Sequence, residues 1–172
     1  MAIRPIIRFP NPLLNMAAEN VSQFDEDLRQ LADDLLDTMH AAPGIGITAP
    51  HIGILRRLTV IEIDPEAGPR TFVNPEIVWQ SEETARQDEG SVSMPGIIEE
   101  VERPRNVRVR YQTLSGETRE EEAAGLLAIC LQHEIDQLNG MFWTRRLSRV
   151  KRERAAKRFE KSLAAPRPLS RA

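Results

Sequence analysis

Apolar residues between positions 125 and 140 recur with the spacing of a helix that buries one side. They are Leu127, Ile129, Cys130, Leu131, Ile135 and Leu138. An Asn-Gly pair, which commonly ends helices, closes the segment. Because His133, Glu134 and Gln137 lie inside it, the pattern predicts a core helix that carries three polar side chains.

Two further helices are expected nearer the chain ends. Residues 22–41 place apolar side chains at spacings of three and four, with aspartates on the other face: Phe24, Leu28, Leu31, Leu35 and Met39 against Asp25, Asp27, Asp33 and Asp37. Residues 145–161 predict a basic helix with Ser148 as its N-cap. Its few expected apolar contacts are Leu147, Val150 and Phe159. Two prolines follow, so residues 164–172 are expected to be a disordered tail.

Between the first helix and the core helix, the pattern changes to the alternation and β-branched content of strands. The expected strands are residues 58–63, 71–73, 77–79, 97–101, 107–111 and 117–122, with a hairpin turn at Ser115-Gly116. Residues 82–89 are interpreted as a polar loop. This order predicts a single α+β domain over residues 1–163, with mostly antiparallel sheets around one buried helix and a basic helix at the C-terminal end.

Composition narrows the setting of the protein. The chain has 172 residues and a single cysteine, which excludes an internal disulfide and fits a reducing compartment. We find no signal peptide and no apolar run as long as a membrane span, so we expect a cytoplasmic location without membrane contact.

The net charge of −3 conceals an uneven distribution. From Arg145 onward there are eleven Lys or Arg residues against two acids, a charge of +9, so the remaining body carries −12. A basic helix on an acidic body is typical either of a solvated surface helix or of contact with an anionic partner such as RNA.

The core helix carries the sequence His133-Glu134-Ile135-Asp136-Gln137. It differs by one residue from His-Glu-x-x-His, in which two imidazoles on one helical face bind a metal and the Glu acts as general base. A His-Glu pair on a helix is more often structural, so this motif alone does not decide the function. Cys130 lies on the same side, although a buried Cys is usually a small hydrophobe.

Three motifs together resemble those of the peptide deformylases, over nearly the whole chain. They read Gly44-Ile45-Gly46-Ile47-Thr48-Ala49-Pro50-His51, Glu89-Gly90-Ser91-Val92-Ser93 and His133-Glu134-Ile135-Asp136-Gln137. The family has, in the same order, Gly-x-Gly-x-Ala-Ala-Pro-Gln, Glu-Gly-Cys-Leu-Ser and His-Glu-x-x-His. The resemblance implies the deformylase fold and a hydrolase that removes the formyl group from the N-terminal methionine of nascent polypeptides.

The resemblance also assigns roles by position. The family's three ligands to Fe²⁺ or Zn²⁺ fall on Ser91, His133 and Gln137, so only His133 is kept. Glu134 keeps the position of the general acid and base, and His51 and Val92 take the positions that stabilise the oxyanion. The residues expected to shape the substrate pocket are Gly44, Gly46, Glu89 and Gly90.

A serine hydroxyl and an amide carbonyl are poor ligands for these metals, so the sequence predicts a metal that is absent or weakly bound. We therefore expect a deformylase-like protein with lost or strongly reduced metal-dependent activity, which still binds peptide N-termini, formyl-methionine among them. One alternative is an active deformylase with a weak or unusual metal site. Another is metal-free hydrolysis by Ser91 and His133.

Three further contacts are expected, those of Arg103 and of the basic helix from the resemblance. Arg103 would pair with Glu89, with Arg105 as a competing candidate, and Asp136 would make a contact near His133. The basic helix 145–161 would dock on the ribosome, as the corresponding helix of the family does.

Overall fold

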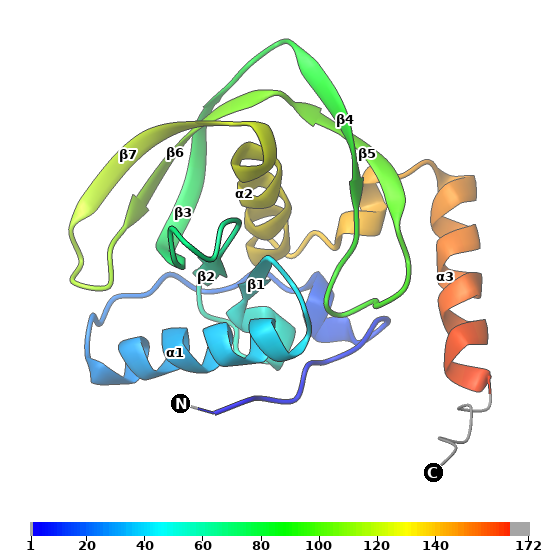
Figure 1. Cartoon of the computed structure of the whole chain (residues 1–172), viewed down its shortest axis with the longest axis horizontal. Coiled ribbons are helices and arrows are strands. Elements are labelled where there is room, and N and C mark those ends of the chain that lie inside the picture. The colour runs from blue at the N-terminus through cyan, green and yellow to red at the C-terminus, as the bar shows by residue number, and fades with distance from the viewer. Residues whose placement is uncertain (1, 166–172) are drawn as a thin grey trace.

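Helix α2 (Gly125–Leu138) stands at the centre of the computed structural model, which describes residues 2–165 (Figure 1). Every residue of α2 from Ala128 to Leu138 is buried, which confirms the expected core helix. The helix ends at Asn139, and Gly140 then adopts a left-handed φ of 79°. A side chain at Gly140 would also approach the Ala17 nitrogen to 2.8 Å, so both backbone and packing require glycine there.

Two antiparallel sheets lie on either side of α2, with β3, β6 and β7 to its left and β4 and β5 to its right in Figure 1. The five-stranded sheet has the order β1 (Gly46–Thr48), β2 (Leu58–Ile61), β3 (Arg70–Gln80), β6 (Asn106–Gln112) and β7 (Thr118–Ala124). The second sheet consists of β4 (Thr84–Glu89) and β5 (Glu99–Pro104). All strand pairs are antiparallel, as the α+β prediction requires.

Strand β4 corrects the prediction of a polar loop at residues 82–89. Its six residues pair in register with β5, from Thr84 opposite Pro104 to Glu89 opposite Glu99. The strand has little β propensity of its own, but cross-strand ion pairs such as Arg86 with Glu100 line its exposed face. Pairing with a neighbouring strand thus overrides local preference, which is common in sheets.

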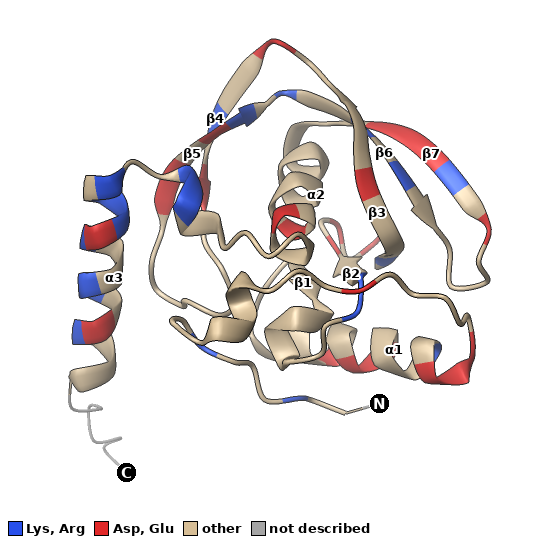
Figure 2. Cartoon of the chain, turned by 180° about the vertical axis from the view of Figure 1, so that it is seen from behind, with Lys and Arg blue, Asp and Glu red and all other residues tan. Residues whose placement is uncertain are grey.

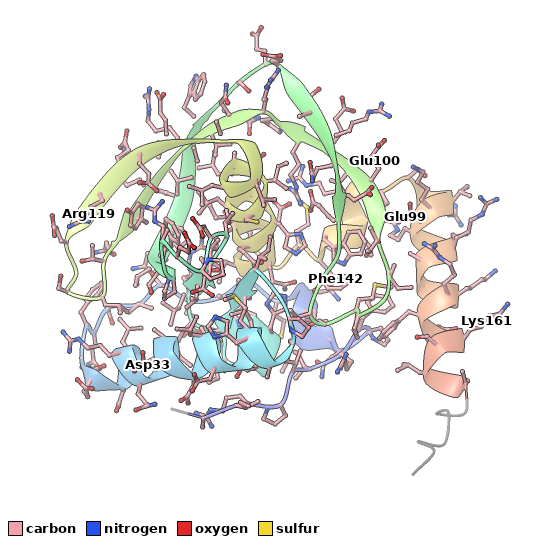
Figure 3. The ribbon with its side chains drawn as sticks, viewed as in Figure 1. Asp33, Glu99, Glu100, Arg119, Phe142 and Lys161 are labelled. Atoms are coloured by element: carbon pink, nitrogen blue, oxygen red, sulfur yellow. The ribbon has the colours of Figure 1, made fainter. Side chains whose placement is uncertain are left out.

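Helix α1 (Glu26–Ala41) packs its apolar face against β1 and β2. It begins four residues later than expected because Asp25 is the N-cap, with its carboxylate accepting a hydrogen bond from the Leu28 N–H at 3.1 Å. Its outer face is polar, and Figure 3 shows Asp33 pointing away from the body.

Helix α3 (Arg149–Ala164) lies at one side of the molecule (Figures 1 and 2). Ser148 caps it as expected, accepting a hydrogen bond from the Lys151 N–H at 3.3 Å. Ala155 and Phe159 are its buried contacts, whereas Val150 is 56% exposed and was wrongly expected to pack.

The limits of the C-terminal helix also differ from the expectation. Arg145 and Arg146 belong to the 3-10 turn η3 (Trp143–Arg146) and not to α3. The helix extends to Ala164, and residues 166–172 of the expected tail lie outside the described residues. Within residues 2–165, no helix combines the length and the apolar character needed to cross a membrane.

The N-terminal segment joins α2, α3 and the loops near α2. Phe9 stacks on Phe142, with the ring centroids 5.4 Å apart (Figure 3). Both rings pack in an apolar cluster that also includes Phe159 of α3. The Ile7 N–H donates to the His51 carbonyl and the Phe9 N–H to the Ser93 carbonyl, each at 2.9 Å. The segment therefore fixes two Gly- and Pro-rich stretches, residues 42–53 and 89–96, against the core.

Candidate functional site

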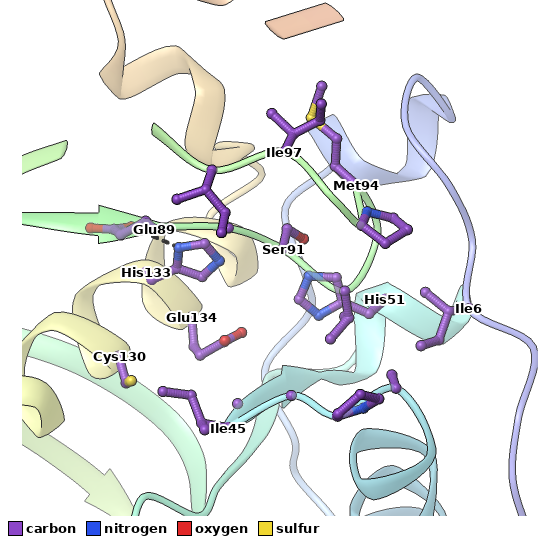
Figure 4. A pocket seen from close by; sticks show the side chains of 18 of the residues that line it. Ile6, Ile45, His51, Glu89, Ser91, Met94, Ile97, Cys130, His133 and Glu134 are labelled. Carbon is purple, nitrogen blue, oxygen red and sulfur yellow. Dashed lines mark hydrogen bonds and ion pairs between the residues drawn. The ribbon is translucent and has the colours of Figure 1, made fainter. Parts of the chain in front are cut away.

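A cavity of about 560 Å³ opens between α2 and the two Gly- and Pro-rich stretches (Figure 4). It combines an apolar wall with a few polar side chains, as small-molecule sites usually do. Nine of the ten residues with expected roles line it: Gly44, Gly46, His51, Glu89, Gly90, Ser91, Val92, His133 and Glu134. Gln137 is the exception, because it does not line the cavity.

His133 is oriented by a buried carboxylate. Its Nδ1 lies 2.8 Å from Glu89 Oε1, so the ring turns its other nitrogen, Nε2, toward the cavity (Figure 4). Burial by itself would lower the pKa of His133, but the hydrogen bond to Glu89 and the charge of Glu134 raise it overall.

Arg103 in turn holds Glu89 with two hydrogen bonds, Nε to Oε2 at 2.6 Å and Nη2 to Oε1 at 2.9 Å. This confirms the expected pair, and the competing Arg105 pairs instead with Glu83 at the surface. Burial would raise the pKa of Glu89, but the bonds to His133 and Arg103 lower it to about 2. Glu89 is therefore an anion at neutral pH.

The network continues to Asp136, whose carboxylate accepts from Arg103 Nη1 at 2.8 Å. Arg146 adds two more bonds to the same carboxylate, at 2.8 and 2.9 Å. Asp136 thus lies near His133 as expected, but its partners are the two arginines. Breaking such a buried network by removing one member typically costs about 3–5 kcal/mol.

Glu134 is buried in the cavity wall, and its Oε2 has no hydrogen-bond partner. Burial raises its pKa to about 7. Gly46 makes room for this carboxylate, because a Cβ at residue 46 would lie 2.7 Å from Glu134 Oε1. Residue 46 must therefore be glycine, because the Glu134 carboxylate occupies the space of a side chain.

The other two glycines that were expected to shape the pocket also lie close to neighbouring atoms. A Cβ at Gly44 would lie 2.9 Å from Val92 Cγ1, and one at Gly90 would lie 3.0 Å from the Ile97 carbonyl oxygen. Val92 therefore forms part of the wall opposite Gly44. Side chains at these glycines would push the wall inward and reduce the cavity.

His51 lies in the 3-10 turn η2 (Ala49–Ile52) and is almost completely buried. Its Nδ1 accepts a hydrogen bond from the Thr48 N–H at 3.0 Å, while Nε2 has no partner. Burial and the proximity of His133 lower the pKa of His51 to about 3. The ring is therefore neutral, with its proton on Nε2. The Thr48 hydroxyl oxygen also lies 2.9 Å from His51 Nδ1, so a Thr three residues before the His is the sequence signal for this arrangement.

Ser91 borders the cavity, with its Oγ accepting a hydrogen bond from the Ser93 N–H at 3.1 Å. Within residues 2–165 no hydrogen bond joins Ser91 to His133. A serine nucleophile needs such a bond to its base, so the arrangement gives no support to metal-free hydrolysis by this pair.

Gln137 points away from the cavity. Its side-chain Nε2 donates to the Leu14 carbonyl at 2.8 Å, which joins α2 to the turn η1 (Pro12–Asn15). The three family ligand positions thus hold one imidazole, one neutral hydroxyl and one amide engaged elsewhere. In the described part of the chain, no group of three or more His, Cys, Asp or Glu side chains has the geometry of a metal site.

Comparison with known proteins places these residues in context. The sequence profile described as polypeptide deformylase matches residues 3–153. A peptide deformylase-like protein of Rhizobium meliloti is 76% identical over 161 residues, covering 94% of each chain. A peptide deformylase of Phenylobacterium zucineum is 47% identical over 168 residues, 96% of this chain and 99% of the relative.

Solved structures agree with this likeness. The crystal structure of a peptide deformylase from Legionella pneumophila has a TM-score of 0.88 at 40% identity, covering 97% of this chain and all of the other. The Ehrlichia chaffeensis enzyme in complex with actinonin has a TM-score of 0.90 at 35% identity, covering 96% and 100%. The resemblance in the three motifs and the expected fold are both confirmed.

Proposed function

The chain belongs to the polypeptide deformylase family, and we propose that it binds peptide N-termini without a tightly held catalytic metal and with little or no hydrolysis. The observation that carries this proposal is the hydrogen bond from Gln137 to the Leu14 carbonyl. It commits the side chain at a family ligand position to a structural contact outside the cavity.

The chemistry of the remaining donors supports the same proposal. Catalytic zinc sites use three protein donors and leave one position for water. Here Ser91 offers a hydroxyl that stays protonated at neutral pH, so His133 is the one strong donor of the three positions. These residues do not fit a resident Zn²⁺ or Fe²⁺.

Retention of the cavity supports binding. Gly44, Gly46 and Gly90 keep its walls apart, and Glu89 with Arg103 keeps His133 in place. The Ehrlichia chaffeensis relative holds actinonin on the same fold. We propose N-terminal methionyl peptides, with or without a formyl group, as ligands of this cavity.

An active deformylase with a weak metal site is the second candidate. Glu134 and His133 both border the cavity, and a relative 47% identical is named peptide deformylase. In this reading water would complete the coordination of a loosely held metal. The protein would then act in protein biosynthesis as the family does, by removing the formyl group from the N-terminal methionine of nascent polypeptides.

One experiment separates the two candidates. Protein purified without chelator is analysed for metal and assayed for release of formate from a formyl-methionyl peptide. We expect well below one Zn or Fe per chain and turnover at the background rate, because two of three donors are weak. Near-stoichiometric metal, with turnover that a chelator abolishes, would establish the active deformylase instead.

A variant that restores the family ligands is the matched control. Ser91→Cys/Gln137→His supplies a thiolate and a second imidazole at the two altered positions. We expect it to bind Zn or Fe and to gain formate release, which Glu134→Ala added to the same background removes. Metal binding without any turnover in the restored variant would show that more than the ligands has diverged.

We also propose that the basic segment, residues 145–161, docks the protein on ribosomal RNA. Seven Lys or Arg residues lie on α3 within this range, and all are exposed: Arg149, Lys151, Arg152, Arg154, Lys157, Arg158 and Lys161. Phosphate contacts from such a helix provide affinity that does not depend on base sequence.

A further inference from the structure

The N-terminal segment places one basic side chain at the edge of the cavity. Ile6 and Arg8 line the cavity, whereas Ile7 and Phe9 pack against the apolar cluster that includes Phe159 of α3. Such alternation is typical of an extended segment with two different faces. Figure 4 shows Ile6 on the side of the cavity opposite Cys130, so Arg8 belongs to the wall across from α2.

Backbone hydrogen bonds on both sides of Arg8 hold it in this position. The Ile7 N–H donates to the His51 carbonyl and the Phe9 N–H to the Ser93 carbonyl, each at 2.9 Å. His51 and Ser93 belong to the two Gly- and Pro-rich stretches that form much of the cavity wall. A rotation of the segment that turned residue 8 away from the cavity would break these bonds.

The guanidinium of Arg8 lacks a partner. The residue is exposed, and its side chain makes no hydrogen bond or ion pair within residues 2–165. A guanidinium carries five N–H donors in a planar fork, and a carboxylate is the group that matches this geometry with two parallel hydrogen bonds. Arg8 is therefore available to a carboxylate of a ligand.

The other charges of the cavity make this choice selective. Arg8 is the one Lys or Arg among the described lining residues, against three acids, Asp88, Glu89 and Glu134. Glu89 is held by Arg103 and Glu134 is buried, whereas Asp88 is exposed and forms no ion pair within residues 2–165. At the exposed edge of the cavity, a ligand carboxylate is thus attracted by Arg8 and repelled by Asp88.

Resting on the proposed binding of peptide N-termini, we infer that Arg8 is a specificity residue that favours ligands with a carboxylate shortly after the N-terminal methionine. Two kinds of peptide offer this group. A very short peptide presents its C-terminal carboxylate, and a longer chain presents the side chain of an Asp or Glu. Because Arg8 is exposed, the gain in affinity is expected to be modest, about three- to tenfold at low salt.

Four peptides test the inference and distinguish the two sources of the carboxylate. Formyl-Met-Ala-Ala is compared with its C-terminal amide, and formyl-Met-Glu-Ala amide with formyl-Met-Gln-Ala amide, by calorimetry on the full chain with a chelator present. We expect the charged member of at least one pair to bind about three- to tenfold more tightly. A preference in the first pair identifies short free peptides, and one in the second pair identifies acidic N-terminal sequences.

Substitutions at residue 8 provide the matched comparison. Arg8→Gln removes the charge and is expected to abolish the preference, whereas Arg8→Glu is expected to reverse it in favour of the neutral peptide. Arg119→Gln removes the same charge from an exposed position of β7 outside the cavity and is expected to keep the preference. Unchanged affinity for the neutral peptides reports that the cavity is intact in each variant. A preference that persists in Arg8→Gln, or that Arg119→Gln reduces equally, would refute the inference.

The outcomes keep the inference and the proposed function apart. Equal affinity within both pairs of peptides would end the inference and leave the binding function intact. Absence of binding for all four peptides would end the proposed function, and the inference with it.

Discussion

Burial sets the chemistry of Cys130, the single cysteine of the chain. Its thiol borders the cavity, but burial, followed by the charge of Glu134, raises its pKa to about 12. Because the thiolate is the form that reacts and binds metals, Cys130 acts as an apolar part of the wall at neutral pH. It does not replace the thiolate missing at residue 91.

We expect native protein at pH 8 to resist alkylation of Cys130 by iodoacetamide. Unfolding should return the thiol to an ordinary pKa near 8.5, so the denatured chain is expected to react at least about tenfold faster. Mass spectrometry after timed quenching measures both rates. Rapid, complete labelling of the folded chain would contradict the assignment of Cys130 to an inert wall.

Helix α2 and the turn η1 are joined by the Gln137 side chain, which donates to the carbonyl of Leu14. The two residues are 123 positions apart in sequence. Arg57 contacts the same end of the helix, because its Nη1 donates to the Leu138 carbonyl and to the Asn139 side chain. The C-terminal part of α2 is thus fixed by elements from the first half of the chain.

Gln137→Ala is expected to lower the free energy of unfolding by about 1–3 kcal/mol, because it leaves the buried Leu14 carbonyl without this donor. Denaturant titration measures the change. Gln87→Ala, at an exposed position of β4, is the control and should stay within about 0.5 kcal/mol of the unaltered protein. Equal stability of Gln137→Ala and the control would show that the bond contributes nothing net.

Charge is distributed unevenly over the whole molecule. Figure 2 shows Lys and Arg along α3, and Asp and Glu along α1 and β7. On β6 and β7 the basic side chains pair with acids, for example Arg108 with Glu122 and Arg110 with Glu120. Three cations of α3, Arg154, Lys157 and Lys161, form no ion pair within residues 2–165. They line a second surface cavity together with Arg158, Glu99 and Glu160. They are free to contact an anionic partner.

If α3 docks on ribosomal RNA, affinity for ribosomes should fall on the order of 100-fold between 50 and 200 mM salt, as expected for about four phosphate contacts. Changing Arg154, Lys157 and Lys161 together to Gln should remove most of that salt dependence. Sedimentation with purified ribosomes measures both effects.

The control for this prediction removes the same charge elsewhere. Changing Arg86, Arg110 and Arg119 to Gln alters the net charge equally on the β-strand surface. Ribosome affinity of this variant should stay close to that of the unaltered protein. Similar losses from both triple variants would indicate a general charge effect and no docking helix.

Features that depend on residues close together in the sequence could be predicted, whereas features that depend on distant residues could not. The core helix and its end were predicted because the apolar spacing and the Asn-Gly pair are local signals. The pair of Arg103 with Glu89 was predicted from the resemblance. Strand β4 was missed because its polar residues become a strand only by pairing with β5.

The sequence by itself determined the family, the α+β order of elements, and the identity of the side chains at the three ligand positions. All three depend on the spacing and the type of residues along the chain, which can be read without knowing the fold. The tertiary structure alone decided that Gln137 points to Leu14 and that His51 offers its Nε2 proton. The direction of a buried polar group depends on which partners packing brings within 3 Å, and no local pattern specifies those partners.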